Sequence, residues 1–155
     1  MRPNWDATWM RIAQIFAERS VCKYWKVGVV IVRDKRILAA GYNGPPKGIV
    51  HCTEVGCHKE DNQGNKIPAG SGKCRGAHAE INAITNAACQ GTMIQGASFY
   101  CTIRPCLDCS KHIINVEAKE IIFLDDYEGE KFALELLREV GVAIRKFELP
   151  KGGVL

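Results

Sequence analysis

Two short motifs hold the residues of this chain that could carry out chemistry: His78-Ala79-Glu80 and Pro105-Cys106-Leu107-Asp108-Cys109. They supply one imidazole, two thiols and one carboxylate. The imidazole and thiols can hold a zinc ion and leave its fourth position open, and the carboxylate can move protons beside it. A purely structural zinc site more often closes its shell with a fourth Cys or His. The combination therefore predicts a catalytic Zn²⁺ site in which Glu80 is a proton shuttle.

The expected elements explain how these side chains could meet. Cys106 and Cys109 are three residues apart and so lie on nearly the same side of a helix that Pro105 opens. Placing both thiols in the first turn lets the helix dipole lower their pKa. His78, the third expected ligand, begins a second helix, and Glu80 points away from the ligand direction yet reaches the metal-bound water. The simpler alternative is two buried cysteines and an exposed glutamate.

Hydrophobic periodicity predicts the elements that carry these motifs. Strands are expected where short apolar runs occur, and helices where apolar residues recur at helical spacing. The expected strands are Val27 to Val32, Arg36 to Tyr42, Ser98 to Thr102, Glu120 to Leu124 and Ala143 to Phe147. The expected helices are Trp5 to about Arg19, Ala77 to Gln90, Pro105 to about Asn115 and Glu130 to Val140. Strand and helix alternate in the second half, which favours an α/β fold whose largely parallel sheet has helices on both faces.

Length and composition indicate how many domains the chain has and which partners and compartment to expect. A chain of 155 residues with 46% hydrophobic and 25% charged residues is most simply one domain, residues 1–155, with a real core. Its net charge of +4 comes without a basic run, so nucleic acid is not an expected partner. No signal peptide or membrane span is recognised, which favours the cytoplasm. There the eight cysteines are more readily metal ligands or reduced thiols than disulfides, although a secreted, disulfide-bonded fragment is the alternative.

One segment differs from the rest of the chain. Residues from about 44 to 76 are rich in Gly, Pro, Cys and His and form an insertion without strong periodicity. A loop of this length usually carries function or a metal. Four cysteines could converge there on a second, closed zinc site, namely Cys22, Cys52, Cys57 and Cys74. The alternatives are His58 as a substitute ligand, or reduced thiols that bind nothing.

The sequence resembles the zinc-dependent cytidine deaminase superfamily and, within it, most closely the deoxycytidylate (dCMP) deaminases. The resemblance covers nearly the whole chain. Beyond the two zinc motifs, it rests on 19–22, 27–32, 41–44, 51–57, 74–84 and 100–102. It implies a three-layer α/β/α sandwich with a mostly parallel, five-stranded mixed sheet. Related deaminases carry a second zinc on cysteines that match Cys22 and Cys52, whereas Cys57 and Cys74 are choices made among the remaining thiols.

The resemblance also implies an activity. It implies that the chain hydrolyses dCMP to dUMP and ammonia, which supplies dUMP for thymidylate synthesis, and that Glu80 takes a proton from the attacking water and delivers protons to N3 and to the departing amine. Asn43 would contact the sugar, and Tyr127 would present an aromatic ring near the substrate. Simpler roles are a turn asparagine and a partly buried loop tyrosine. The family further implies a homo-oligomer, commonly a hexamer, with dCTP and dTTP as effectors.

One departure concerns the phosphate. Relatives usually have a basic residue where this chain has Cys89, which cannot pair with phosphate. Phosphate contacts must therefore come from elsewhere, and Lys26, Lys47, Lys73 and Arg75 are available. Competing functions are deamination of dCTP, of a free nucleoside or of adenosine in tRNA, and a zinc-stabilised binding module without catalysis. The unligated Glu80 argues against the last of these.

Overall fold

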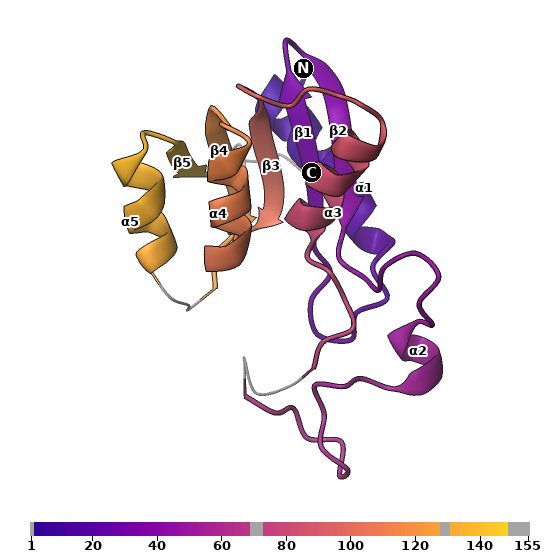
Figure 1. Cartoon of the computed structure of the whole chain (residues 1–155). Helices are drawn as coiled ribbons and strands as arrows, with labels where there is room; N and C mark the ends of the chain where they lie inside the picture. The colour runs from indigo at the N-terminus through magenta and orange to yellow at the C-terminus, as the bar shows by residue number, and fades with distance from the viewer. Residues whose placement is uncertain (1, 69–72, 128–130, 149–155) are drawn as a thin grey trace.

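The computed structural model describes residues 2–68, 73–127 and 131–148 and contains a five-stranded sheet between layers of helices (Figure 1). In chain order the elements are α1 (Trp5–Glu18), β1 (Gly28–Arg33), β2 (Arg36–Tyr42), α2 (Cys52–Val55), α3 (Ala79–Cys89), β3 (Ser98–Ile103), α4 (Leu107–Asn115), β4 (Glu120–Asp125), α5 (Phe132–Glu139) and β5 (Ala143–Lys146). The expected elements are all present, with boundaries close to those predicted. The predicted start of the fifth helix, Glu130, lies outside the described residues.

The sheet has the strand order β2-β1-β3-β4-β5. β1 pairs antiparallel with both β2 and β3, whereas the β3–β4 and β4–β5 pairs are parallel. The predicted five-stranded mixed sheet is confirmed, but its pairings are evenly divided rather than mostly parallel. One antiparallel pair comes from the hairpin between β1 and β2, where Asp34 and Lys35 adopt φ values of 50° and 58°. The other arises because β3 runs antiparallel to β1.

Each face of the sheet has its own hydrophobic core. On one face, α1 packs through Met10 and Ala13 against a cluster that includes Val30 and Ile122. On the other face, α3, α4 and α5 cover a larger cluster that includes Phe99. In Figure 1 these three helices lie in front of the sheet and α1 lies behind it. The expected three-layer α/β/α arrangement is therefore confirmed.

Two glycines allow helices to approach the sheet closely. A Cβ atom at Gly28 would lie 1.9 Å from the carbonyl oxygen of Ala13 in α1. A Cβ atom at Gly41 would lie 2.5 Å from the amide nitrogen of Ala83 in α3. The side-chain amide of Asn82 also donates to the carbonyl oxygen of Tyr42 at 2.8 Å, so α3 is fixed against β2. These contacts with β2 therefore fix the position of the N-terminal end of α3 relative to the sheet.

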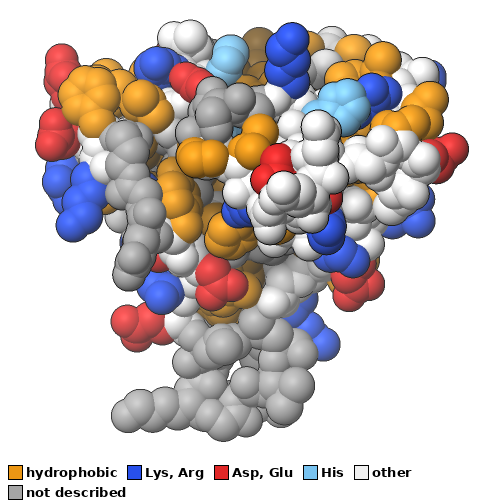
Figure 2. Space-filling model, turned by 90° about the horizontal axis from the view of Figure 1, so that it is seen from below, with side chains coloured by type: hydrophobic (Ala, Val, Ile, Leu, Met, Phe, Trp, Pro, Cys, Tyr) orange, Lys and Arg blue, Asp and Glu red, His pale blue; other side chains and the backbone are white. Residues whose placement is uncertain are grey.

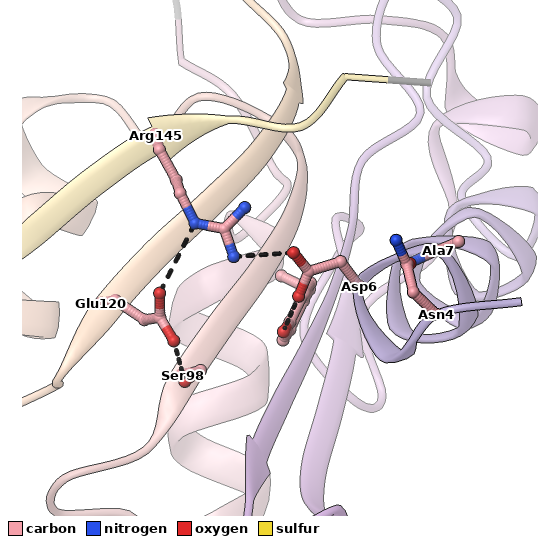
Figure 3. Close-up of polar contacts among 7 residues, drawn as sticks. Asn4, Asp6, Ala7, Ser98, Glu120 and Arg145 are labelled. Carbon is pink, nitrogen blue, oxygen red and sulfur yellow. Dashed lines mark hydrogen bonds and ion pairs between the residues drawn. The ribbon is translucent and has the colours of Figure 1, made fainter. Parts of the chain in front are cut away.

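A polar network fixes the start of α1 to the sheet (Figure 3). Asp6 accepts a hydrogen bond from the hydroxyl of Tyr100 at 2.7 Å and pairs with Arg145 at 2.8 Å. Arg145 also lies 3.7 Å from Glu120, which accepts a bond from Ser98 at 2.8 Å. The network joins α1, β3, β4 and β5, and burial together with the bond to Asp6 raises the pKa of Tyr100.

The segment between β2 and α3 extends below the sheet in Figure 1 and carries only the short helix α2 among its described residues. Gly44 and Ala77 exchange two backbone hydrogen bonds where this loop leaves and rejoins the sheet. Glu60 and Lys66 form a second bridge within the loop. Within the described parts of the chain, none of the helices combines the length and the apolar character needed to cross a bilayer.

Gly41→Ala tests whether the close contact of α3 with β2 supports the fold. The added methyl group collides with helix backbone, so we expect the free energy of unfolding to fall by about 1–3 kcal/mol. Gly44→Ala is the matched control, because the nearest atom to its Cβ lies 4.0 Å away and we expect a change within about 0.5 kcal/mol. Urea denaturation followed by circular dichroism measures both, and equal stability of the two variants would contradict the assignment.

Candidate active site

The candidate site lies where two helices begin at one edge of the sheet. His78 is the N-cap of α3, and Cys106 is the N-cap of α4. Both have extended backbone, with φ and ψ of −72° and 154° for His78 and −72° and 174° for Cys106. The expectation that Pro105 places both thiols inside the first turn is wrong for Cys106, since α4 begins only at Leu107. Cys109 does lie in that first turn.

The three predicted ligands converge. His78 Nδ1 lies 3.4 Å from Cys106 Sγ and 3.3 Å from Cys109 Sγ. Tetrahedral zinc with Zn–S bonds of about 2.3 Å and Zn–N bonds of about 2.0 Å separates such atoms by about 3.5 Å. Within residues 2–68, 73–127 and 131–148, this is the one group of three His, Cys, Asp or Glu side chains with ligand atoms within 4.8 Å of one another. The donor set and its spacing fit one zinc ion.

The two thiols differ in their readiness to ionise. The hydrogen bond from Cys109, followed by that from His78, lowers the pKa of Cys106 to about 4. The same bond to Cys106, together with burial, raises the pKa of Cys109. The bond to Cys106 also raises the pKa of His78. Cys106 is therefore the more readily ionised of the two thiols, and it lies beside the imidazole.

Glu80 is a carboxylic acid buried at the edge of this cluster. Its side chain lies in the first turn of α3 and is only 4% exposed. Cys109 Sγ donates to Glu80 Oε2 at 3.4 Å, so the carboxyl group lies directly beside the ligand atoms. Burial raises the pKa of Glu80. A carboxyl group with a raised pKa can accept and return a proton nearer to neutral pH than an exposed one.

A cavity of about 780 Å³ opens over this cluster and is lined by His78, Glu80 and Cys106 among others. Aliphatic and aromatic side chains, including Trp25 and Ile103, form much of its wall. Figure 2 looks onto this side of the molecule and shows hydrophobic side chains exposed in its middle, with charged side chains around them. A mostly apolar cavity of this size with a few convergent polar groups suits a small organic ligand.

Both residues expected to contact substrate line this cavity. The side chain of Asn43 accepts from the amide of Val27 at 2.8 Å and donates to the carbonyl oxygen of Trp25 at 2.8 Å. Its amide therefore fixes the cavity wall, as a turn residue would, and it retains one further N–H. Tyr127 follows β4 and is half-buried. The expectation that these residues bind substrate stays a prediction for both.

The four cysteines proposed for a second metal lie around one part of the cavity. Cys22, Cys52, Cys57 and Cys74 all line it, and all are unpaired thiols. Burial and then the charges of Cys57, Cys74 and Cys22 raise the pKa of Cys52, so the four thiols are electrostatically coupled. Their sulfur atoms do not include three within 4.8 Å of one another. Backbone amides donate to two of them, Trp25 N to Cys22 at 3.5 Å and Gly76 N to Cys74 at 3.4 Å.

The cations at the cavity are not those that the sequence suggested. Lys26, Lys47, Lys73 and Arg75 are absent from the described residues that line it. The lining cations are Lys23, Lys59, Lys66 and Arg104. The sequence carries no signal for these four, because the cavity is formed by segments that are distant in the chain. Cys89, at the end of α3, is exposed and outside the lining, so its thiol has no contact with this cavity.

A His/Cys/Cys cluster beside a buried glutamate, at helix starts on an α/β/α sheet, defines the class of zinc-dependent deaminases. Residues 3–125 match the family model described as the cytidine and deoxycytidylate deaminase zinc-binding region. The chain therefore belongs to the cytidine and deoxycytidylate deaminase family.

Similar proteins agree with this membership. ComE operon protein 2 of Bacillus subtilis (strain 168) is 37% identical over 96% of this chain and 74% of its own length. The deoxycytidylate deaminase of Saccharomyces cerevisiae is 34% identical over 95% of this chain and 46% of its own length, so this chain spans about half of that relative. A dCMP deaminase from cyanophage S-TIM5, solved in complex with dCMP and dUMP, has a TM-score of 0.78 and 32% identity over 95% of this chain and 99% of its own.

Proposed function

We propose that this chain catalyses the hydrolytic deamination of dCMP to dUMP and ammonia. The observation that carries the proposal is the buried carboxyl group of Glu80 beside three zinc-type ligands, where Glu80, His78 and Cys106 line a cavity large enough for a nucleotide. Support also comes from the cyanophage relative, whose structure holds dCMP and dUMP, and from relatives named deoxycytidylate deaminase. A structural zinc site has no use for an unligated, buried glutamate.

The chemistry follows from the positions of these groups. His78, Cys106 and Cys109 would hold a zinc ion, which would supply the Lewis acidity that activates a water molecule at neutral pH. Glu80 accepts a proton from the attacking water as the water oxygen bonds to C4 of cytosine, and it passes this proton to N3. Glu80 then takes the remaining proton of the new C4 hydroxyl and gives it to the amine, so that C4=O forms as the C4–N4 bond breaks and ammonia leaves. Burial of Glu80 lowers the local dielectric around its carboxyl group, which strengthens its electrostatic interactions.

Lys59 is the cation best placed to bind the 5′-phosphate of the substrate. Its side chain is half-buried at the cavity wall, and within the described residues it has no ion-pair partner. By contrast, Lys23 is paired with Glu60 at 2.6 Å, and exposed Lys66 lies over the ring of Tyr24. The positive charge of Lys59 acts to lower the pKa of His78, although the bond from Cys106 outweighs it. Lys59 and the catalytic cluster line the same cavity, so we propose that one nucleotide reaches both.

A second, structural zinc on Cys22, Cys52, Cys57 and Cys74 is part of the proposal. The electrostatic coupling of the four thiols and the N–H···S bonds to two of them support it, since backbone amides commonly stabilise thiolate charge. Metal binding would have to draw the sulfur atoms closer, since no three of them lie within 4.8 Å of one another. A closed site there would offset the entropy of ordering this long loop.

Assembly, regulation and location rest on the family resemblance. We propose a homo-oligomer that acts in the cytoplasm, with dCTP and dTTP as effectors. Exposed hydrophobic side chains on α1 and nearby, such as Ile15 at 60% and Trp25 at 49%, are available for contacts between subunits. The thiol ligands require a compartment that keeps cysteine reduced.

Glu80→Gln tests the function and the mechanism together. We expect wild-type protein loaded with zinc to release ammonia from dCMP, and the variant to lose at least about 100-fold in kcat because an amide cannot carry the proton. Zinc content should be unchanged, since Glu80 is not a ligand. Glu135→Gln, an exposed change of the same type on α5, serves as the control and should keep full activity. If Glu80→Gln were as active as the wild type, the proposed role of Glu80 in proton transfer would be wrong.

Lys59→Met tests the phosphate contact. Loss of a charge-assisted hydrogen bond of about 1.5–3 kcal/mol should raise KM for dCMP about 10- to 100-fold and leave the KM for deoxycytidine, which lacks phosphate, unchanged. Lys47→Met is the matched control, because Lys47 is exposed on the same loop and does not line the cavity. A similar rise in KM for both substrates would contradict a phosphate role for Lys59.

Metal analysis of Cys57→Ser tests the second zinc. We expect a zinc-to-protein ratio near about two in wild type and near about one in the variant, because a closed site needs four ligands. Cys89→Ser, which changes an exposed thiol outside the cavity, should keep the wild-type ratio. A ratio near one in the wild-type protein would remove the second site from the proposal and leave the catalytic zinc in place.

A further inference from the structure

Arg104 is a buried cation at the cavity that the zinc chemistry and the phosphate contact leave unexplained. It follows β3 and comes directly before Pro105 and the ligand Cys106, and its side chain is 4% exposed. Its backbone N–H donates to the carbonyl oxygen of Asp125 at 2.9 Å, which extends the pairing of β3 with β4. A guanidinium group placed so deeply loses its hydration and needs strong compensation.

Among the described residues, the polar contacts of the Arg104 side chain go to the two residues that follow β4. Its Nε pairs with Asp126 Oδ1 at 2.5 Å, and its Nη2 donates to the carbonyl oxygen of Tyr127 at 3.3 Å. Its Cζ lies 4.7 Å from the centre of the Tyr127 ring. The same Asp126 oxygen accepts from the backbone N–H of Tyr127 at 2.8 Å. Arg104 thus contacts the backbone and the ring of Tyr127 and also the side chain of Asp126, the residue before it.

Stability alone is a weak reason for an arginine here. The Asp126 side chain is 51% exposed, so water screens its pair with Arg104. Arg104 Nη1 is buried and has no hydrogen-bond partner among the described residues, which adds a desolvation cost. An apolar side chain of similar volume would fill this space at lower cost. What an apolar side chain cannot do is hold the carbonyl oxygen and the ring of Tyr127 in one orientation.

We propose that Arg104 is a positioning residue that holds the ring of Tyr127 against the nucleotide in the cavity. The inference rests on the proposed function and deepens it, because both residues line the cavity that contains His78 and Glu80. Arg104 acts on the substrate through Tyr127. Its removal should therefore weaken substrate binding more than it slows the proton transfers of Glu80.

Steady-state kinetics of Arg104→Met with dCMP tests this role. We expect KM to rise about 10-fold or more, kcat to change by less than about threefold, and zinc content to stay at the wild-type level. Arg104→Lys keeps a positive charge for Asp126 but loses the planar fork and the ring contact, so we expect KM to stay raised. If Arg104→Lys had the wild-type KM, the function of Arg104 would be its ion pair with Asp126 alone, and the proposal would be overturned.

A double-mutant cycle with Tyr127→Ala separates positioning from a general effect on the fold. If Arg104 acts through Tyr127, Arg104→Met should raise KM by less than about twofold in the Tyr127→Ala background. Independent, multiplicative effects of the two changes would overturn the proposal. Arg33→Met is the matched control: Arg33 also donates to a distant carbonyl oxygen, that of Gln95 at 2.6 Å, but lies outside the cavity lining, and the KM should not change.

Asp126→Asn keeps the experiment decisive if Arg104→Met does not fold. Asp126 is half-exposed, so its replacement should leave the fold intact while it loosens Arg104, and we expect a smaller rise in KM of about threefold. Wild-type protein that releases no ammonia from dCMP would overturn the proposed function and this inference with it. An active wild type whose KM is unchanged in Asp126→Asn and in any folded Arg104→Met overturns the inference alone.

Discussion

The distance between one imidazole nitrogen and two sulfur atoms depends on α3 and α4 beginning at the same edge of the sheet. α3 is fixed by its close approach to β2 at Gly41, and α4 by the three residues that join it to β3. Because His78 and Cys106 are both N-caps with extended backbone, their side chains can turn toward each other instead of along their helices. A shift of either helix by about one residue, which is a rise of about 1.5 Å, would remove ligand geometry.

This arrangement brings several acidic groups together, and two of them, Cys109 and Glu80, are buried. Two thiols and the carboxyl group of Glu80 surround a single imidazole, so the cluster is short of positive charge. The pKa directions show how the protein resolves this: Cys106 ionises, whereas Cys109 and Glu80 hold their protons to higher pH. A divalent cation supplies the missing charge and allows both thiols to ionise. Glu80 then remains as the group that can exchange a proton with a ligand in the cavity.

The sequence predicted those features that depend on neighbouring residues. Strand and helix boundaries agree to within a few residues because hydrophobic periodicity, the turn at Asp34 and Lys35, and the Asn4 side chain that accepts from the backbone N–H of Ala7 at the start of α1 all act locally. The convergence of His78, Cys106 and Cys109 beside Glu80 could be predicted because two short motifs contain these residues. The direction of β3 relative to β1 was not predicted, because the long loop between β2 and α3 permits either direction. Cys106 was placed inside the helix because proline is common at a first helical position, but here Pro105 precedes the cap.

Residues that shape the cavity wall were the hardest to foresee. Arg104 lies against Tyr127, and Lys59 acts electrostatically on His78. Folding brings these neighbours together, and isolated arginines and lysines in a sequence carry no signal of them. This division has a physical consequence. The reacting groups lie on helix starts that the sheet holds rigidly, whereas Lys59 and the four cysteines lie on or beside the loop. Changes in that loop can therefore alter which ligand binds while the geometry at Glu80 is preserved.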